Sequence, residues 1–158
     1  MLNHDEILRL LPYGNDAIRL DEVTELDCLK SAEGIYYLII PSSEEPMRLS
    51  EIRFSCMQAI LETAGVAVFC SGNYDDKLMD FLNMDRARFD IDFLEAAMQF
   101  EADTVIELST EVEILETSKD SATAAGIIKY DKRQILEISF DFWLLTAQEL
   151  KDRNGKLG

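Results

Sequence analysis

The sequence predicts an α+β domain in which one long apolar helix packs against an antiparallel β-sheet. Residues 51–69 repeat apolar side chains at three- and four-residue steps, and from residue 59 onward nearly every face is apolar. A helix with that pattern is buried in a core. The runs of β-type sequence around it do not alternate with helices. Covering one face of a sheet with a single helix is the economical way to pack such elements.

The length of the chain predicts the number of domains, and its net charge excludes some classes of partner. The chain has 158 residues, 47% of them hydrophobic, which favours one domain with its own core. We expect residues 1–148 to form this domain and residues 149–158 to form a polar, frayed C-terminal tail. The chain carries 15 Lys and Arg against 31 Asp and Glu, a net charge of −16. Because this charge repels phosphate backbones and anionic lipids, neither nucleic acid nor a membrane surface is an expected partner.

Several features favour a cytoplasmic location. The N-terminus has no basic region followed by an apolar one, so it does not read as a signal peptide. The longest uncharged apolar stretch, near residues 64–70, is too short to span a bilayer. The cysteines (Cys28, Cys56 and Cys70) are odd in number and lack metal-ligand spacing. This pattern fits a reducing compartment, with Cys56 as a small buried apolar residue.

The N-terminal part predicts a short helix followed by a β-hairpin. Asn3 and Glu6 have the spacing of a capping box, and Pro12 stops the helix near Leu11. The hairpin is expected from a strand within residues 17–29, a turn at residues 31–34 and a second strand over residues 35–40.

The long helix is bounded by turn and cap signals. Two prolines enclose residues 42–45, which predicts a loop. Ser50 is the expected N-cap, although Arg53 stands where a reciprocal Glu would complete a capping box. Gly72 breaks the helix. Beyond it the sequence predicts a short helix over 75–82, a strand over 84–89, a helix over 93–100, and strands over 104–115, 122–129 and 135–145.

This order of elements is that of the hotdog fold, and three segments resemble one hotdog family. Residues 10–23 read LLPYGNDAIRLDEV, which resembles the opening LLPHRxPxLLVDRV of the 3-hydroxyacyl-[acyl-carrier-protein] dehydratases. Residues 57–65 resemble their helix segment IEAMAQAAG, and residues 84–89 their strand IDKARF. The resemblance extends over residues 10–145. It implies a hotdog homodimer paired through edge strands, a role in fatty-acid or polyketide-type acyl metabolism, and no cofactor.

The chain departs from that family at the residues that carry catalysis. The family motif GHFPGxPxMPG falls on residues 43–53, where Pro46 alone is retained. Glu44 stands at the position of the catalytic His, and Gln58 at the position of the catalytic Glu on the helix. Gln58 cannot transfer a proton, and Glu44 could act as a base only if burial raised its pKa. We therefore expect the usual dehydratase chemistry to be absent.

The resemblance leaves other functions open. The protein could bind an acyl chain or thioester without dehydrating it. It could be an active dehydratase using Glu44, or a thioesterase using Glu62 one turn beyond Gln58, since hotdog thioesterases commonly use one helix carboxylate. It could also be a structural partner in an acyl-modifying complex. The substrate-binding candidates follow the motif and the helix: Pro46, Met47, Phe54, Met57 and Leu61.

The expected partner is an acyl-CoA or acyl-carrier-protein thioester. Carrier proteins are themselves acidic, so the net charge of −16 opposes their docking unless a local basic patch overrides it. A heterodimer with a catalytically intact relative would not be active at either site. This chain lacks both members of the catalytic pair, so each of the two shared sites would still lack one member. The single histidine, His4, lies far from the motif, so no histidine metal cluster is expected and no metal site is predicted.

Overall fold

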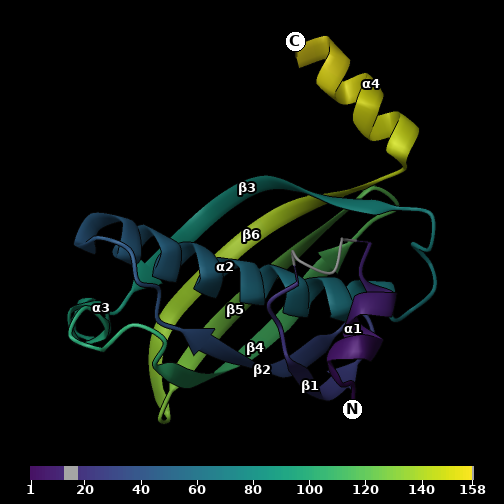
Figure 1. Cartoon of the computed structure of the whole chain (residues 1–158). Helices are drawn as coiled ribbons and strands as arrows, with labels where there is room; N and C mark the ends of the chain where they lie inside the picture. The colour runs from purple at the N-terminus through teal and green to yellow at the C-terminus, as the bar shows by residue number, and fades with distance from the viewer. Residues whose placement is uncertain (13–17, 158) are drawn as a thin grey trace.

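A long helix lies in the curve of a six-stranded antiparallel sheet (Figure 1). The computed structural model describes residues 1–12 and 18–157, except for the side chains of 81–83, 85, 156 and 157. The helix is α2, Glu45–Phe69, and the predicted α+β architecture is confirmed. The strands, in sheet order, are β1 (Glu22–Asp27), β2 (Ser31–Ile39), β4 (Val105–Thr117), β5 (Ser121–Tyr130), β6 (Arg133–Leu145) and β3 (Leu78–Phe89).

Alternation along the strands builds the core against α2. In β4 to β6 every second side chain is buried, as the predicted pattern requires. Gly126 lets the helix approach closely, because a Cβ there would lie 2.8 Å from the side chain of Ile60. The hydroxyls of Thr63 on α2 and Thr110 on β4 are 2.8 Å apart, which satisfies both buried groups. By length and composition α2 could also cross a membrane, but its apolar residues are mostly buried in this core.

The first helix forms as predicted, whereas the hairpin turn is displaced. Helix α1, His4–Leu10, begins at Asn3 with the predicted capping box. The turn between β1 and β2 lies at residues 28–30, where Leu29 has φ 64°. The predicted turn at residues 31–34 is wrong, because these residues belong to β2. Gly34 serves close packing: a Cβ there would lie 2.8 Å from the carbonyl oxygen of Glu22.

Helix α2 begins more than one turn before the predicted cap. Its N-cap is Glu44, and Pro46 lies in its first turn, where a missing N–H costs nothing. The prediction of Ser50 as N-cap is therefore wrong. Residues 45–53 lack the glycines of the family motif, so nothing in them interrupts helical geometry.

The segment after α2 is extended. Residues 78–82, predicted as part of a short helix, belong to β3, which pairs with β6 over nearly its whole length. Helix α3, Ile91–Ala97, is shorter than the predicted helix over 93–100. Its N-cap is Asp90, which accepts hydrogen bonds from the backbone of Asp92 and Phe93.

The C-terminal segment is helical, which contradicts the predicted frayed tail. Helix α4, Ala147–Leu157, runs away from the sheet (Figure 1). Thr146 and Glu149 close its first turn through two reciprocal hydrogen bonds of 3.1 Å. The guanidinium of Arg153 pairs with Asp80 and lies 5.8 Å from the ring centre of Trp143. These contacts tie a polar helix to the end of the sheet.

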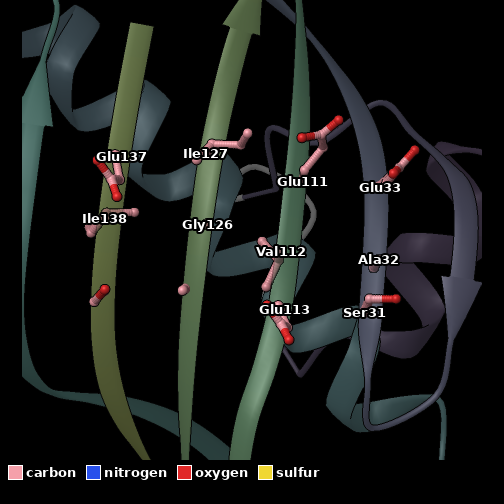
Figure 2. A pocket seen from close by; sticks show the side chains of 12 residues that line it. Ser31, Ala32, Glu33, Glu111, Val112, Glu113, Gly126, Ile127, Glu137 and Ile138 are labelled. Carbon is pink, nitrogen blue, oxygen red and sulfur yellow. The ribbon is translucent and has the colours of Figure 1, made fainter. Parts of the chain in front are cut away.

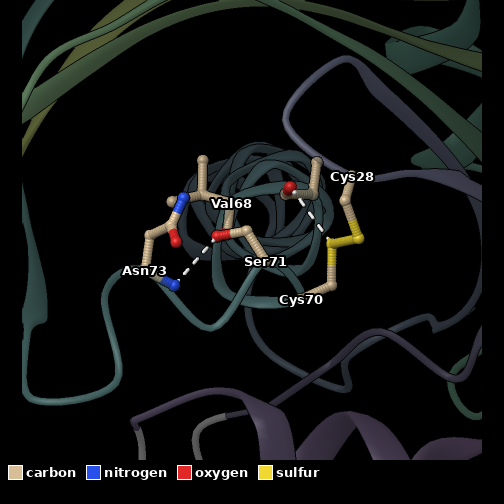
Figure 3. The surroundings of a disulfide bond; sticks show 6 residues. Cys28, Val68, Cys70, Ser71 and Asn73 are labelled. Atoms are coloured by element: carbon tan, nitrogen blue, oxygen red, sulfur yellow. Dashed lines mark hydrogen bonds between the residues drawn. A yellow bond between two sulfur atoms is a disulfide. The ribbon is translucent and has the colours of Figure 1, made fainter.

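Cys28 and Cys70 form a disulfide, which the odd number of cysteines did not predict (Figure 3). Their Cα atoms are 5.9 Å apart, and their sequence separation is 42. The bond joins the β1–β2 turn to the C-terminal end of α2. Leu29 fastens the same turn, since its N–H donates to the carbonyl oxygen of Ala67 at 2.8 Å. Cys56 is free and buried as predicted, and burial raises the pKa of its thiol to about 12.

Candidate functional site

Glu44, the residue aligned with the family histidine, lies at the exposed start of α2. It is the N-cap by backbone geometry, but its side chain makes no capping hydrogen bond. The neighbouring Glu45 is also exposed. A carboxylate in this position is surrounded by water, which is a poor setting for a general base.

Gln58 and Glu62 meet on α2 and hold the chain segment that follows α1. Oε1 of Glu62 accepts hydrogen bonds from the backbone N–H groups of Arg19 and Leu20, each at 2.8 Å. Oε2 of Glu62 accepts one from the side-chain amide of Gln58 at 3.0 Å. His4 braces the same segment, because its Nδ1 lies 2.9 Å from the carbonyl oxygen of Leu20. The Glu62 carboxylate thus anchors residues 19 and 20 to the central helix.

Burial and hydrogen bonding shift the pKa of Glu62 in opposite directions. The side chain is fully buried, and this desolvation raises the pKa of the carboxyl group. The hydrogen bonds from Leu20, Gln58 and Arg19 partly offset the shift, since each favours the charged form. The net direction is upward, so ionised Glu62 is less stable in the folded chain than in water.

The two positions of the family's catalytic pair are far apart within this chain. Fourteen residues separate Glu44 from Gln58 on one helix, which is about 21 Å along its axis at 1.5 Å per residue. The two side chains cannot act on the same atom from a single chain. The structure brings Gln58 to Glu62 and leaves Glu44 by itself.

The predicted substrate-binding residues lie along α2 at two levels of exposure. Pro46 and Met47 are exposed in its first turn, and Phe54 is 58% exposed. Met57 and Leu61 are partly buried against the core. Arg53 points toward β3, since its guanidinium lies 5.9 Å from the ring centre of Phe89. Met57, one turn further along α2, lies on the same side of the helix.

Sequence reasoning missed Arg19, which links the N-terminal segment to two turns of α2. Its Nε donates to the hydroxyl of Ser55 at 3.3 Å, and its guanidinium lies 5.2 Å from the ring centre of Phe54. Burial raises the pKa of the Tyr36 phenol, and the Ser55 side chain partly offsets this shift. The available signal was the substitution itself, because Arg19 stands where the family pattern LLPHRxPxLLVDRV has an apolar Leu.

The outer face of the sheet has a shallow acidic depression of about 350 Å³ (Figure 2). The side chains of Glu33 on β2, Glu111 and Glu113 on β4, and Glu137 on β6 stand around it. Glu33 and Glu111 are directly opposite each other in the β2–β4 register, and partial burial together with nearby carboxylates raises the pKa of Glu33. Anionic groups such as phosphates are repelled from this face.

Two basic side chains near the sheet, Lys129 and Arg133, pair with carboxylates. Lys129 pairs with Glu111 at 3.3 Å, and Arg133 pairs with both Asp90 and Asp92 on the α3 side. Among the described residues, no group of three His, Cys, Asp or Glu side chains is arranged to hold a metal ion.

Comparison with known proteins gives structural matches only. No protein-family sequence model matches the chain, and no curated protein matches it in sequence. The dehydratase heterocomplex ApeI:P from Xenorhabdus doucetiae superposes with a TM-score of 0.69 at 14% identity, over 96% of this chain and 97% of that one. A candidate thioesterase from Syntrophus aciditrophicus gives 0.59 at 14% identity, over 85% and 88%.

A hypothetical thioesterase from Streptococcus pneumoniae, solved with coenzyme A, gives a TM-score of 0.52 at 9% identity, over 79% of this chain and 85% of that one. These identities establish a shared fold and not a shared activity. The strand order, the central helix and these matches agree. The chain is a hotdog-fold protein.

Proposed function

We propose that this protein binds an acyl chain or acyl thioester and does not dehydrate it. One observation carries the proposal: at the two aligned catalytic positions, neither side chain is arranged to transfer protons. Glu44 is exposed at a helix start. Gln58 has no ionisable group and uses its amide to hold Glu62. The dehydratase and thioesterases that share the fold support acyl thioesters as the ligand class.

The chemistry of dehydration explains why this arrangement is insufficient. Removal of water from a 3-hydroxyacyl thioester needs a base for the α-proton and an acid for the departing hydroxyl. Loss of one such group typically costs ~10²- to 10⁴-fold in rate. With both groups absent, little acceleration over the uncatalysed reaction remains.

Hydration of a crotonyl thioester, the reverse reaction, tests the proposal. We expect purified protein to give no turnover above a buffer blank, with either coenzyme A or carrier protein as the thiol. Glu44→Gln should leave that result unchanged. Turnover by the natural sequence that disappears in Glu44→Gln would show that Glu44 has replaced the family histidine, and the proposal would be wrong.

Thioester hydrolysis is the second candidate, and it rests on Glu62. Burial raises the pKa of this carboxyl group, as is common for groups that act in proton transfer. Its three hydrogen bonds weigh against the role, because they leave little room for a water molecule on either oxygen. Hydrolysis of a butyryl thioester that is lost in Glu62→Gln would favour this candidate over simple binding.

We also propose that two copies pair through β3. This twelve-residue strand is at the end of the strand order, and no other described strand pairs with its outer side. A long open edge is a template for another strand. On α2, Arg53 lies over Phe89 of β3, and the partly buried Met57 follows one turn later on the same side of the helix, so a dimer through β3 would bury Met57 further.

Light scattering after size exclusion measures the assembly. We expect a particle of twice the 18.0 kDa chain mass. Met57→Glu should shift it to the single-chain mass, because a carboxylate would be buried in the dimer. Leu115→Glu is the matched control: Leu115 is 54% exposed on β4, which lies inside the sheet and not beside β3, and its replacement should leave the dimer intact. A natural sequence that runs as a single chain would contradict pairing and favour a role with a different partner chain.

A further inference from the structure

A second pocket, separate from the aligned catalytic positions, opens beside the N-terminal half of α2. Its volume is about 420 Å³, within the range of small-molecule sites. The apolar walls are Leu38 and Ile39 at the end of β2, Pro41 just beyond that strand, and Phe54 on α2. Neither Glu44 nor Gln58 lines it.

The pocket exists because β1, the strand beside β2, begins only at Glu22 and does not extend along the last residues of β2. Asp21 makes the last contacts to β2 on this side: its N–H donates to Ile35 and its carboxylate accepts from the N–H of Tyr37. The chain on the N-terminal side of Asp21 leaves the sheet edge and crosses to α2, where Glu62 holds Arg19 and Leu20. The end of β2 beyond Tyr37 therefore faces α2 across an open space.

Arg19 brings a positive charge to this apolar space in a fixed orientation. Its backbone is bonded to Glu62, its Nε donates to Ser55, and its guanidinium lies over the ring of Phe54. None of the ion pairs among the described residues includes Arg19, although acidic residues outnumber basic ones twofold. The carboxylate of Glu62 is bonded to backbone N–H groups and to Gln58, and not to this guanidinium.

We propose that this pocket binds a small free carboxylate with an apolar tail, such as a short fatty acid. A guanidinium matches a carboxylate through two parallel hydrogen bonds, and the apolar walls suit an alkyl chain. A single arginine favours a monoanion over a phosphate, because the exposed Glu51 also lines the pocket and repels a second negative charge. The site holds a free acid and uses none of the aligned catalytic residues, so it goes beyond the proposed thioester function.

Calorimetric titration with butyrate, hexanoate and octanoate at low ionic strength tests the proposal. We expect saturable binding that strengthens with chain length, and a loss of about tenfold or more in affinity in Arg19→Leu, because a charged hydrogen-bonded pair is removed. Hexanol, which lacks the charge, should bind the natural sequence and Arg19→Leu equally. Arg9→Leu, a change at an exposed arginine of α1, is the matched control and should bind like the natural sequence.

A second variant tests the proposal even if Arg19→Leu does not fold. Ser50→Phe fills the pocket and keeps Arg19, so it should abolish octanoate binding while thermal unfolding stays cooperative. No saturable binding of octanoate, equal binding by Arg19→Leu, or inorganic phosphate binding as tightly as hexanoate would each overturn the proposal. The thioester assays substitute Glu44 and Glu62 and measure turnover, whereas this titration measures binding of a free acid, so the two proposals can fail separately.

Discussion

Replacement of both Cys28 and Cys70 by serine is expected to lower the free energy of unfolding by about 4 kcal/mol. The disulfide closes a loop with a sequence separation of 42 residues, and the loss of loop-closure entropy in the unfolded chain gives about this value. Urea unfolding of the natural and doubly substituted chains measures it. The effect is large because 5–15 kcal/mol is the usual total stability of a domain.

A reductant provides the control for that experiment. It should destabilise the natural chain by a similar amount and leave the double variant unchanged, since Cys56 is free in both. Equal stability of the natural chain with and without reductant would show that the bond is absent in solution. The sequence-based expectation of reduced cysteines would then hold for the whole chain.

Glu62→Ala is expected to lower the free energy of unfolding by about 3 kcal/mol. The change orphans the backbone N–H groups of Arg19 and Leu20 and frees the amide of Gln58, and each unsatisfied buried group costs about 1–3 kcal/mol. Glu62→Gln keeps an oxygen for the two N–H groups, and glutamine is the residue that the resembled family has here. It should lie within about 1 kcal/mol of the natural chain at neutral pH.

The same pair of variants gives a pH test with a definite sign. Because burial raises the pKa of folded Glu62 above 4.5, the folded state binds this proton more tightly than the unfolded state. The natural chain should therefore lose stability relative to Glu62→Gln as pH rises above 4.5, until Glu62 is ionised in both states. A stability difference that does not change with pH would contradict the assigned direction.

The sequence predicted the core of the fold because the core depends on periodicity. The apolar steps along residues 51–69 and the alternation in 104–115 reflect burial directly, and both elements formed as expected. The capping box at Asn3 was equally local, since both partners lie within one turn. Such signals do not depend on distant parts of the chain.

The errors arose where distant contacts decide the local structure. The sequence predicts a turn at Gly34, but Gly34 is a strand residue that lets the backbone near Glu22 approach. Residues 78–82 have an ambiguous pattern and become a strand because β6 pairs with them. The Cys28–Cys70 bond could not be deduced either, because it needs the hairpin turn placed at the end of α2.

In the candidate site, too, the sequence identified residues from local motifs but not the contacts between distant residues. Aligned motifs identified Glu44, Gln58 and Glu62, but not that Glu62 faces the backbone of Arg19 and Leu20. That contact spans 43 residues in sequence and is set by how the N-terminal segment crosses α2. The pocket lined by Arg19 likewise depends on where the chain leaves the sheet edge.

The proposed function requires that the hotdog fold binds an acyl ligand while the residues at the aligned catalytic positions transfer no proton. The most direct measurement is proton NMR of a 3-hydroxybutyryl thioester mixed with the protein in D₂O. We predict broadened acyl signals, which report binding, with no deuterium entering the α-carbon and no crotonyl product beyond a buffer control. Deuterium at the α-carbon at a rate set by protein concentration would mean that a base still acts there, and the proposed function would be wrong.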